Sequence, residues 1–151
     1  MATAPLSLTG RALRLLSSRE HSRSELEHKL IRFEEEPGQL AKVLDQLAAK
    51  DFINESRVVE SVLHRRSAKL GASRIKRELQ AKGLELEAVS QAMDQLRSSE
   101  LDRAKEVWRK KFGSPAQSVS ERAKQMRFLA SRGFGGDVIH KVLQGGFEDL
   151  E

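Results

Sequence analysis

The chain has 151 residues and a formal net charge of +5, with 27 lysine and arginine residues against 22 acidic residues. It contains no cysteine, which excludes disulfide frameworks, thiolate zinc sites and cysteine nucleophiles. It has no run of about twenty apolar residues to span a bilayer, and its start lacks the apolar block of a secretory signal. We therefore expect a soluble, cytoplasmic protein with no part in a membrane.

The composition favours helices over strands. Leucine and alanine together number 35, whereas the β-branched residues valine, isoleucine and threonine number 15. No stretch of four or more residues alternates cleanly between apolar and polar side chains, as a half-buried strand would. The sequence therefore predicts an all-α protein of about nine helices.

Three helices are predicted in the first third of the chain. The first covers residues 9–18. The second begins at Ser22 and Glu25, whose spacing is typical of a capping box, in which each side chain bonds the backbone N–H of the other residue. The third is predicted to begin at Pro37, because the fixed φ of proline suits a first helical turn.

The middle third predicts three more helices. Asn54 is a suitable N-cap for the fourth helix, which ends near Gly71. The fifth helix is predicted to begin at Ser73 and to stop at Gly83, because glycine adopts a left-handed conformation without steric cost. A sixth helix then runs through Leu96.

The last third predicts helices seven to nine. The seventh covers residues 99–112, and the composition of residues 113–118, GSPAQS, is that of a linker. Ser118 and Glu121 have the spacing of a second capping box, which begins the eighth helix. The ninth carries apolar residues between 138 and 143.

The predicted helices fall into three sets of three that repeat in sequence. Segment 73–96 aligns with segment 24–47 at an offset of 49, and both end in Asp-Gln-Leu. At an offset of 50, the turn 82–84, Lys-Gly-Leu, matches the turn 132–134, Arg-Gly-Phe. Units of some fifty residues bury little surface alone, so neighbouring units must stack. We expect an elongated, curved array with one long concave face.

The sequence predicts the following organisation. A flexible N-terminus at 1–8 precedes repeats at 9–52, 53–98 and 99–145, of which the last contains the linker at 113–118, and an acidic tail follows at 146–151.

Positive charge is concentrated in two blocks, 65–82 and 101–132, each with a net charge of +6. A solvated helix face is the simplest interpretation of such residues. However, Arg74, Lys76 and Arg77 lie at a predicted helix start, where the helix dipole disfavours cations. We therefore favour an anionic partner, either a phosphate backbone or an acidic protein surface. The candidate partner-binding residues are Arg65, Arg66, Lys69, Arg74, Lys76, Arg77, Lys82, Arg109, Lys110, Lys111, Arg127 and Arg132.

The sequence offers little support for catalysis, for a metal or for any cofactor. The four histidines, at 21, 28, 64 and 140, lack metal-binding spacings, and we interpret them as surface residues. Glycines around Phe134 superficially resemble a phosphate loop, but no strand precedes them, so we interpret this segment as a turn between helices. Trp108 and Phe112 are interpreted as core residues and not as a base-stacking platform. We expect no enzymatic activity.

Three ordered stretches carry a family resemblance: REHSRSELEHKL at 19–30, KLGASRIKRELQAKGLELEAVSQAM at 69–93 and RFLASRGFGGDVIHKVL at 127–143. They resemble the first-repeat motif, the central signature and the C-terminal hallmark of the RecX family, regulators of the bacterial recombinase RecA. The chain departs from the family pattern at Val58 and Val59, where an aromatic residue and an alanine are usual. The roles of the family's residues at these positions are therefore not assigned to Val58 and Val59.

The resemblance implies three tandem three-helix repeats that lie along the groove of the RecA filament on single-stranded DNA. Such proteins block filament growth or promote filament loss, which lowers strand exchange, ATP hydrolysis and repressor cleavage during homologous recombination, DNA repair and the SOS response. The implied partner is RecA, with possible direct DNA contact, and we expect a monomer. The alternative is a stand-alone helical DNA-binding module, but no exposed helix face offers a set of base-reading side chains.

Overall fold

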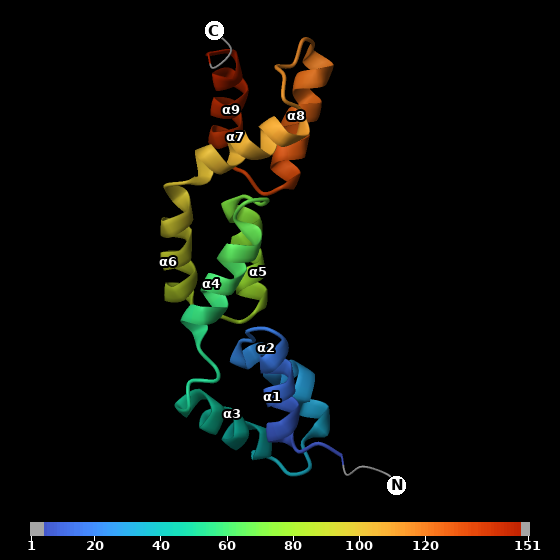
Figure 1. Ribbon diagram of the computed structural model, residues 1–151, viewed down its shortest axis with the longest axis vertical. Helices are drawn as coiled ribbons and strands as arrows, with labels where there is room; N and C mark the ends of the chain where they lie inside the picture. Colours follow the sequence, from blue (N-terminus) through green and yellow to red (C-terminus); the bar gives the residue numbers. More distant parts are fainter. Residues whose placement is uncertain (1–4, 149–151) are drawn as a thin grey trace.

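The computed structural model describes residues 5–148, in which nine α-helices stack into an elongated array without strands (Figure 1). The prediction of an all-α fold is confirmed. The predicted flexible N-terminus and acidic tail lie partly outside the described residues. The helices are α1 (Leu8–Ser18), α2 (Arg23–Leu30), α3 (Gln39–Ala49), α4 (Glu55–Arg66), α5 (Ala72–Ala81), α6 (Leu86–Arg97), α7 (Glu100–Lys111), α8 (Val119–Ser131) and α9 (Gly136–Glu148), with a short 3-10 helix, η1 (Ile31–Phe33), after α2.

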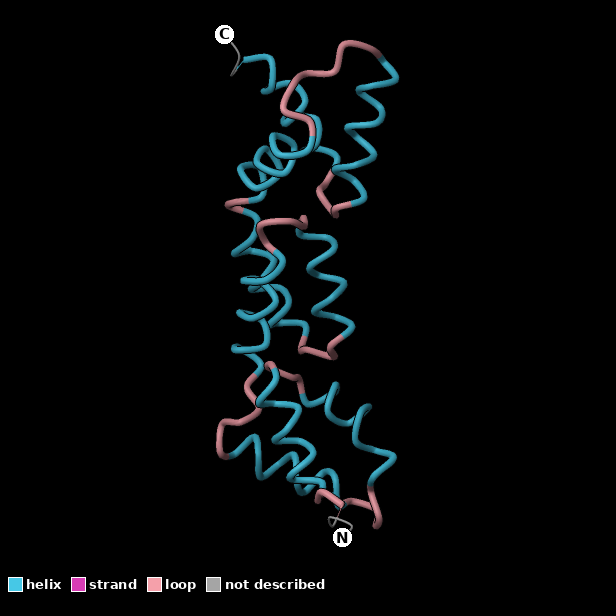
Figure 2. Tube along the Cα trace, turned by 45° about the vertical axis from the view of Figure 1, so that its right-hand side comes forward, coloured by secondary structure: helices cyan, strands magenta, loops and turns pink. Residues whose placement is uncertain are grey.

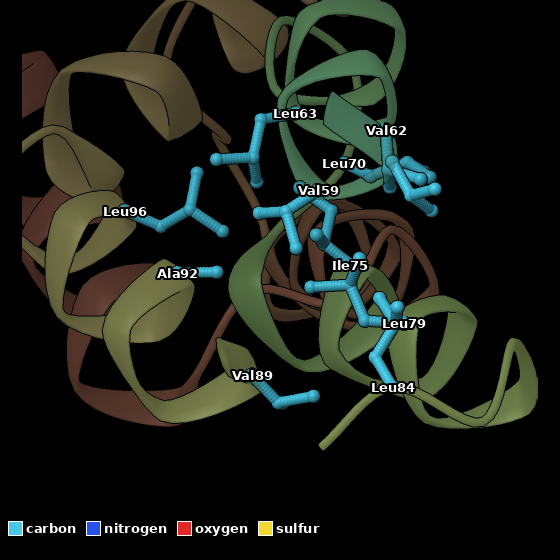
Figure 3. Close-up of a cluster of buried hydrophobic side chains, with 11 residues drawn as sticks. Val59, Val62, Leu63, Leu70, Ile75, Leu79, Leu84, Val89, Ala92 and Leu96 are labelled. Carbon is cyan, nitrogen blue, oxygen red and sulfur yellow. The ribbon is translucent and has the colours of Figure 1, made fainter. Parts of the chain in front are cut away.

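Each set of three helices encloses its own hydrophobic core. The first core lies among α1, α2 and α3 and includes Leu26 and Leu44. The second lies among α4, α5 and α6, where Ile75 and Leu79 are fully buried (Figure 3). The third lies among α7, α8 and α9 around Leu129. Three small cores therefore replace one large one, which explains how a chain with modest apolar content folds.

Two helix starts follow the predicted capping chemistry. Ser22 accepts a hydrogen bond from the backbone N–H of Glu25, and the carboxylate of Glu25 accepts one from the backbone N–H of Ser22. The side chain of Asn54 accepts from the backbone N–H of Arg57 at the start of α4. Both caps satisfy backbone donors that would otherwise lack a partner.

The predicted start of the third helix at Pro37 is wrong. Helix α3 begins at Gln39, and Gly38 precedes it with a left-handed φ of 86°. Residue Pro37 belongs to the turn that connects η1 with α3. The cap comes instead from Glu34, whose carboxylate accepts a hydrogen bond of 2.9 Å from the backbone N–H of Leu40.

Two further helix starts also differ from the prediction. Helix α5 begins at Ala72 after Gly71, so Ser73 lies in its first turn and bonds a neighbouring repeat instead of capping the helix. At α8 only half of the predicted capping box forms. Ser118 accepts from the backbone N–H of Glu121, but the carboxylate of Glu121 accepts from Gln117, one residue earlier than predicted.

The second helices of the three sets lie along one side of the array. Helices α8, α5 and α2 follow one another down the right of Figure 1, whereas α3, α6 and α9 lie to the left. The Cα trace turned by 45° shows the same end-to-end succession (Figure 2). The three repeats therefore follow one another along the long axis of the molecule.

Candidate partner-binding surface

The turns that reveal the repeat in the sequence are also the contacts between repeats. The hydroxyl of Ser22 at the start of α2 donates to the carbonyl oxygen of Lys82 after α5, at 2.5 Å. The hydroxyl of Ser73 in the first turn of α5 donates to the carbonyl oxygen of Gly133 after α8, at 2.7 Å. Each pair is 60 residues apart in sequence. A serine at the start of one helix therefore bonds a carbonyl of the turn after the previous helix at both junctions, although the two serines and the two carbonyls hold different positions in the repeat.

These contacts join α8, α5 and α2 into one column, which we call the helix column. The C-terminal turn of α8 meets the N-terminus of α5, and the C-terminal turn of α5 meets the N-terminus of α2. The three helices therefore run in the same direction. Their dipoles align head to tail, so carbonyl groups at one helix end face the N–H groups of the next.

The helix column carries most of the excess positive charge. Residues 72–82, which comprise α5 and its last turn, hold four bases and one acid, and residues 119–132, at α8, also hold four bases and one acid. By contrast, α6 holds one base and two acids, and α3 holds one of each. Half of the charge of each basic block thus lies on the helix column, along its middle and C-terminal repeats, and the other half lies outside it, at residues 65–71 and 101–111.

The structure divides the twelve candidate residues into two groups. Five form no ion pair and no side-chain hydrogen bond with the side chains described, those of residues 5–144, and are themselves exposed. They are Arg65, Lys69, Lys76, Arg77 and Arg127. The other seven make contacts within the chain, and the strength of these contacts decides how available each residue is to a partner.

Two candidates help to hold the repeats together. The ammonium of Lys82 pairs with the carboxylate of Glu25 at 3.2 Å, and their side chains are only 12% and 13% exposed. The guanidinium of Arg74 donates to the carbonyl oxygen of Ser131 across the second junction, at 2.8 Å. The unfavourable dipole at the start of α5 is thus offset at Arg74 by a carbonyl at the C-terminal end of α8.

The remaining five candidates make exposed contacts. Arg66 pairs with Glu78, Arg109 and Lys110 pair with Glu106, and Lys111 and Arg132 lie over the ring of Phe128. Exposed ion pairs contribute little to stability, and cation–π contacts at exposed sites contribute about 0.5–1 kcal/mol. These side chains can therefore turn toward a partner at small cost.

Glu25 is the electrostatic centre of the first junction. Burial alone would raise the pKa of its carboxyl group. Hydrogen bonds from Arg19 and from the backbone of Ser22, together with the charge of Lys82, outweigh burial and lower the pKa to about 2. The carboxylate thus combines a capping role within α2 with an ion pair to the next repeat.

Two residues of α7 connect the third repeat to the second, and the sequence analysis missed this role. The guanidinium of Arg103 donates to the carbonyl oxygens of Ser67 and Leu70, both at 2.8 Å. The carboxylate of Glu100 accepts from the backbone N–H of Ala72 at 3.2 Å, which caps α5. Burial lowers the pKa of Arg103. The charge count assigned Arg103 to the basic block at 101–132. The sequence around Arg103 contains no motif that distinguishes it from an exposed arginine.

The interpretation of His21 as a surface residue is wrong, because it is 1% exposed. Its Nδ1 lies 3.0 Å from the carbonyl oxygen of Arg19, and the ammonium of Lys29 donates to its Nε2 at 2.9 Å. This pairing fixes a neutral ring with its proton on Nδ1. Burial lowers the pKa of His21 further than its hydrogen bond to Arg19 raises it.

Sequence comparisons identify the family. Residues 10–47 match the first three-helix domain of RecX and residues 98–143 match its third three-helix domain. The regulatory protein RecX of Leptothrix cholodnii is 48% identical over 139 residues, which cover 92% of this chain and 88% of the relative. The chain belongs to the RecX family. The RecX regulatory protein of Ralstonia nicotianae is 43% identical over 93% of this chain and 89% of its own length.

Solved structures of RecX proteins share the fold. RecX from Lactobacillus salivarius superposes with a TM-score of 0.75 at 22% sequence identity, and the match covers 95% of this chain and 96% of that protein. A second RecX structure gives a TM-score of 0.72 at 19% identity over 89% of this chain and 70% of the other. Among the described helices of this RecX-family chain, none is long and apolar enough to cross a bilayer.

Proposed function

We propose that this RecX-family chain regulates RecA by binding the RecA filament on single-stranded DNA and blocking its extension. Binding lowers the recombinase, ATPase and coprotease activities of RecA. The chain acts in the bacterial cytoplasm as a non-enzymatic modulator and binds as a monomer. The helix column is the binding surface, and its basic side chains contact acidic protein surface, DNA phosphates or both.

The observation that carries the proposal is the repetition of charge along the helix column. Arg77 on α5 and Arg127 on α8 are 50 residues apart, hold equivalent positions and are both exposed. Arg74 and Lys124 form a second equivalent pair. A filament presents the same surface at regular intervals, so charges that recur on two successive helices of the column can engage neighbouring subunits at once. Many weak contacts of this kind add up to tight binding.

The direct test is the ATPase activity of RecA on single-stranded DNA, measured with increasing amounts of this protein. We expect strong inhibition at amounts well below one copy per RecA monomer, because blocked filament ends stop growth. An unchanged ATPase rate at stoichiometric amounts would overturn the proposal. The fluorescence anisotropy of labelled single-stranded DNA, measured without RecA, shows whether the protein binds DNA directly or binds only the filament.

A charge-reversal variant tests the surface itself. Lys76→Glu, Arg77→Glu and Arg127→Glu change three exposed side chains that have no partner among the side chains of residues 5–144. We expect this triple variant to lose at least tenfold in inhibitory potency while its circular dichroism stays unchanged. The matched control reverses three exposed lysines away from the helix column, Lys42, Lys50 and Lys141, and should keep full potency. Equal potency of both variants would show that the column is not the binding surface.

A further inference from the structure

A second basic site lies in the first repeat, outside the two basic blocks at 65–82 and 101–132. Helix α1 and the end of α2 enclose a hollow of about 480 Å³, which is within the range of ligand-binding pockets. Its lining combines three leucines with five basic residues and one aromatic ring, and it contains no carboxylate. The basic and aromatic lining residues are Arg11, Arg14, His28, Lys29, Arg32 and Phe33.

The cations of this pocket gather without acidic partners. Arg11, Arg14 and Arg32 form no ion pair with the side chains of residues 5–144, although all three line the same hollow. The guanidinium groups of Arg11 and Arg32 lie 3.8 and 4.7 Å from the centre of the Phe33 ring. Like charges held close together destabilise a fold. This cost indicates that an anionic group outside the chain completes the site.

The apolar lining restricts the kind of ligand. Leu6, Leu15 and Leu30 line the hollow, and Leu6 is 44% exposed. The neighbouring Ile31 is 56% exposed. A ligand that covers this surface must itself bring an apolar group, because exposed aliphatic surface gains only from contact with another apolar surface.

We propose that this pocket binds an acidic peptide segment of another protein, with a large apolar side chain in the hollow and carboxylates at its basic rim. A nucleic acid fits less well. Its phosphates gain nothing from aliphatic side chains, and the ring of Phe33, which would stack a base, is already covered by guanidinium groups. The adjoining hollow, which shares Arg11 and Phe33, contains Glu35. This acid repels carboxylates and limits how far the peptide extends. The proposal does not depend on RecA as the partner of the helix column.

Binding can be measured with a fluorescein-labelled peptide of alternating glutamate and leucine residues. We expect saturable binding to the full chain that weakens with added salt. Exchange of the peptide's leucines for serine should weaken binding at least tenfold, because the hollow then stays uncovered. Equal binding of the serine peptide would overturn the proposal, because the site would then recognise charge alone.

Two double variants test whether the peptide binds in this pocket. Arg14→Glu with Arg32→Glu changes two exposed residues of the pocket and should reduce peptide affinity at least tenfold, with an unchanged helical spectrum. Lys42→Glu with Lys50→Glu makes the same charge change elsewhere in the first repeat and should leave affinity within twofold. Equal losses in both variants would overturn the proposal. Tighter binding of an oligothymidylate than of the peptide, lost in the Arg14/Arg32 variant, would overturn it in favour of a nucleic-acid site.

Discussion

Gly71 and Gly133 pack backbone against backbone where the second repeat meets the third. The backbone N–H of Gly71 donates to the carbonyl oxygen of Arg132 at 2.7 Å. A Cβ atom on Gly71 would overlap the carbonyl group of Gly133, and one on Gly133 would overlap Arg74. Gly133 also has a left-handed φ of 95°. Two glycines thus allow the start of α5 to contact the turn after α8 directly.

The first prediction concerns this glycine contact. Gly71→Ala is compatible with the backbone conformation, φ −80° and ψ 169°, so only the overlap with Gly133 opposes it. We expect a loss of about 1–3 kcal/mol in the free energy of unfolding, as for other overpacked sites. Urea denaturation followed by circular dichroism measures this loss. Gly135→Ala, where a Cβ meets nothing within 4 Å, should change stability by less than about 0.5 kcal/mol.

The second prediction concerns the acid stability of the first junction. The pKa of Glu25 is about 2 in the folded chain, against an ordinary value of 4.5 that applies when the chain is unfolded. The carboxylate of Glu25 therefore binds a proton more readily in the unfolded chain. Stability from this carboxylate is complete above about pH 5 and is lost as the pH falls toward 2. The loss is at most about 3 kcal/mol. Glu25→Gln should be less stable at pH 7 and should lose less stability below pH 5. The exposed Glu27→Gln is the control and should follow the wild type.

The third prediction concerns His21 and a different pH range. Burial lowers the pKa of His21 below its ordinary value of 6.5. As the pH falls, His21 is therefore protonated earlier in the unfolded chain than in the folded chain. Stability should therefore fall as the pH drops below about 6.5, well before Glu25 is protonated. His21→Gln should flatten the stability profile between pH 7 and 5, whereas Glu25→Gln should keep the fall in this range, because the charge of Glu25 only opposes the lowering of the His21 pKa. A flat wild-type profile in this range would contradict the prediction.

Local patterns predicted the features that depend on local chemistry. The capping box at Ser22 and the cap at Asn54 lie within one helical turn, so four residues of sequence are enough to recognise them. The repeat was also visible, because the Lys82 and Arg132 turns recur at a constant offset. Contacts between repeats were not predictable in this way. Ser73 bonds Gly133 from 60 residues away, and its hydroxyl therefore does not cap its own helix.

The basic residues illustrate the same limit. The net charge of a block assigned Arg74, Lys76 and Lys82 the same role of partner binding. In the structure Lys82 belongs to a partly buried ion pair and Arg74 to a junction, whereas Lys76 is exposed without a partner among the side chains of residues 5–144. These roles depend on which carbonyl or carboxylate the fold places nearby, and no spacing along the chain encodes that.

The fourth prediction concerns Arg103, which bonds two carbonyl groups of the preceding repeat. Arg103→Leu removes these bonds and leaves the carbonyls of Ser67 and Leu70 without their donor. We expect a loss of about 1–3 kcal/mol, as for other buried polar groups that lose a partner. Hydrogen exchange should accelerate most in the connection between α4 and α5. Arg97→Leu removes an arginine whose side chain is 76% exposed and should leave this connection protected.

The last prediction concerns the hydrogen bond inside the third core. The indole Nε1 of Trp108 donates to the side-chain oxygen of Gln125 at 2.9 Å, and the amide of Gln125 donates to the carbonyl oxygen of Ser114 at 3.2 Å. Trp108→Phe keeps an aromatic ring but leaves the oxygen of Gln125 buried without a donor. We expect this change to cost about 1–3 kcal/mol, measured by urea denaturation with circular dichroism.

A second substitution tests the cause of that loss. In the double variant Trp108→Phe with Gln125→Leu, no polar side chain remains buried at this position. The second change should therefore cost less in the Trp108→Phe background than in the wild type, because removing both partners of a buried hydrogen bond costs less than removing one. Equal costs in the two backgrounds would mean that the hydrogen bond contributes nothing and that Trp108 stabilises the third repeat through its packing alone.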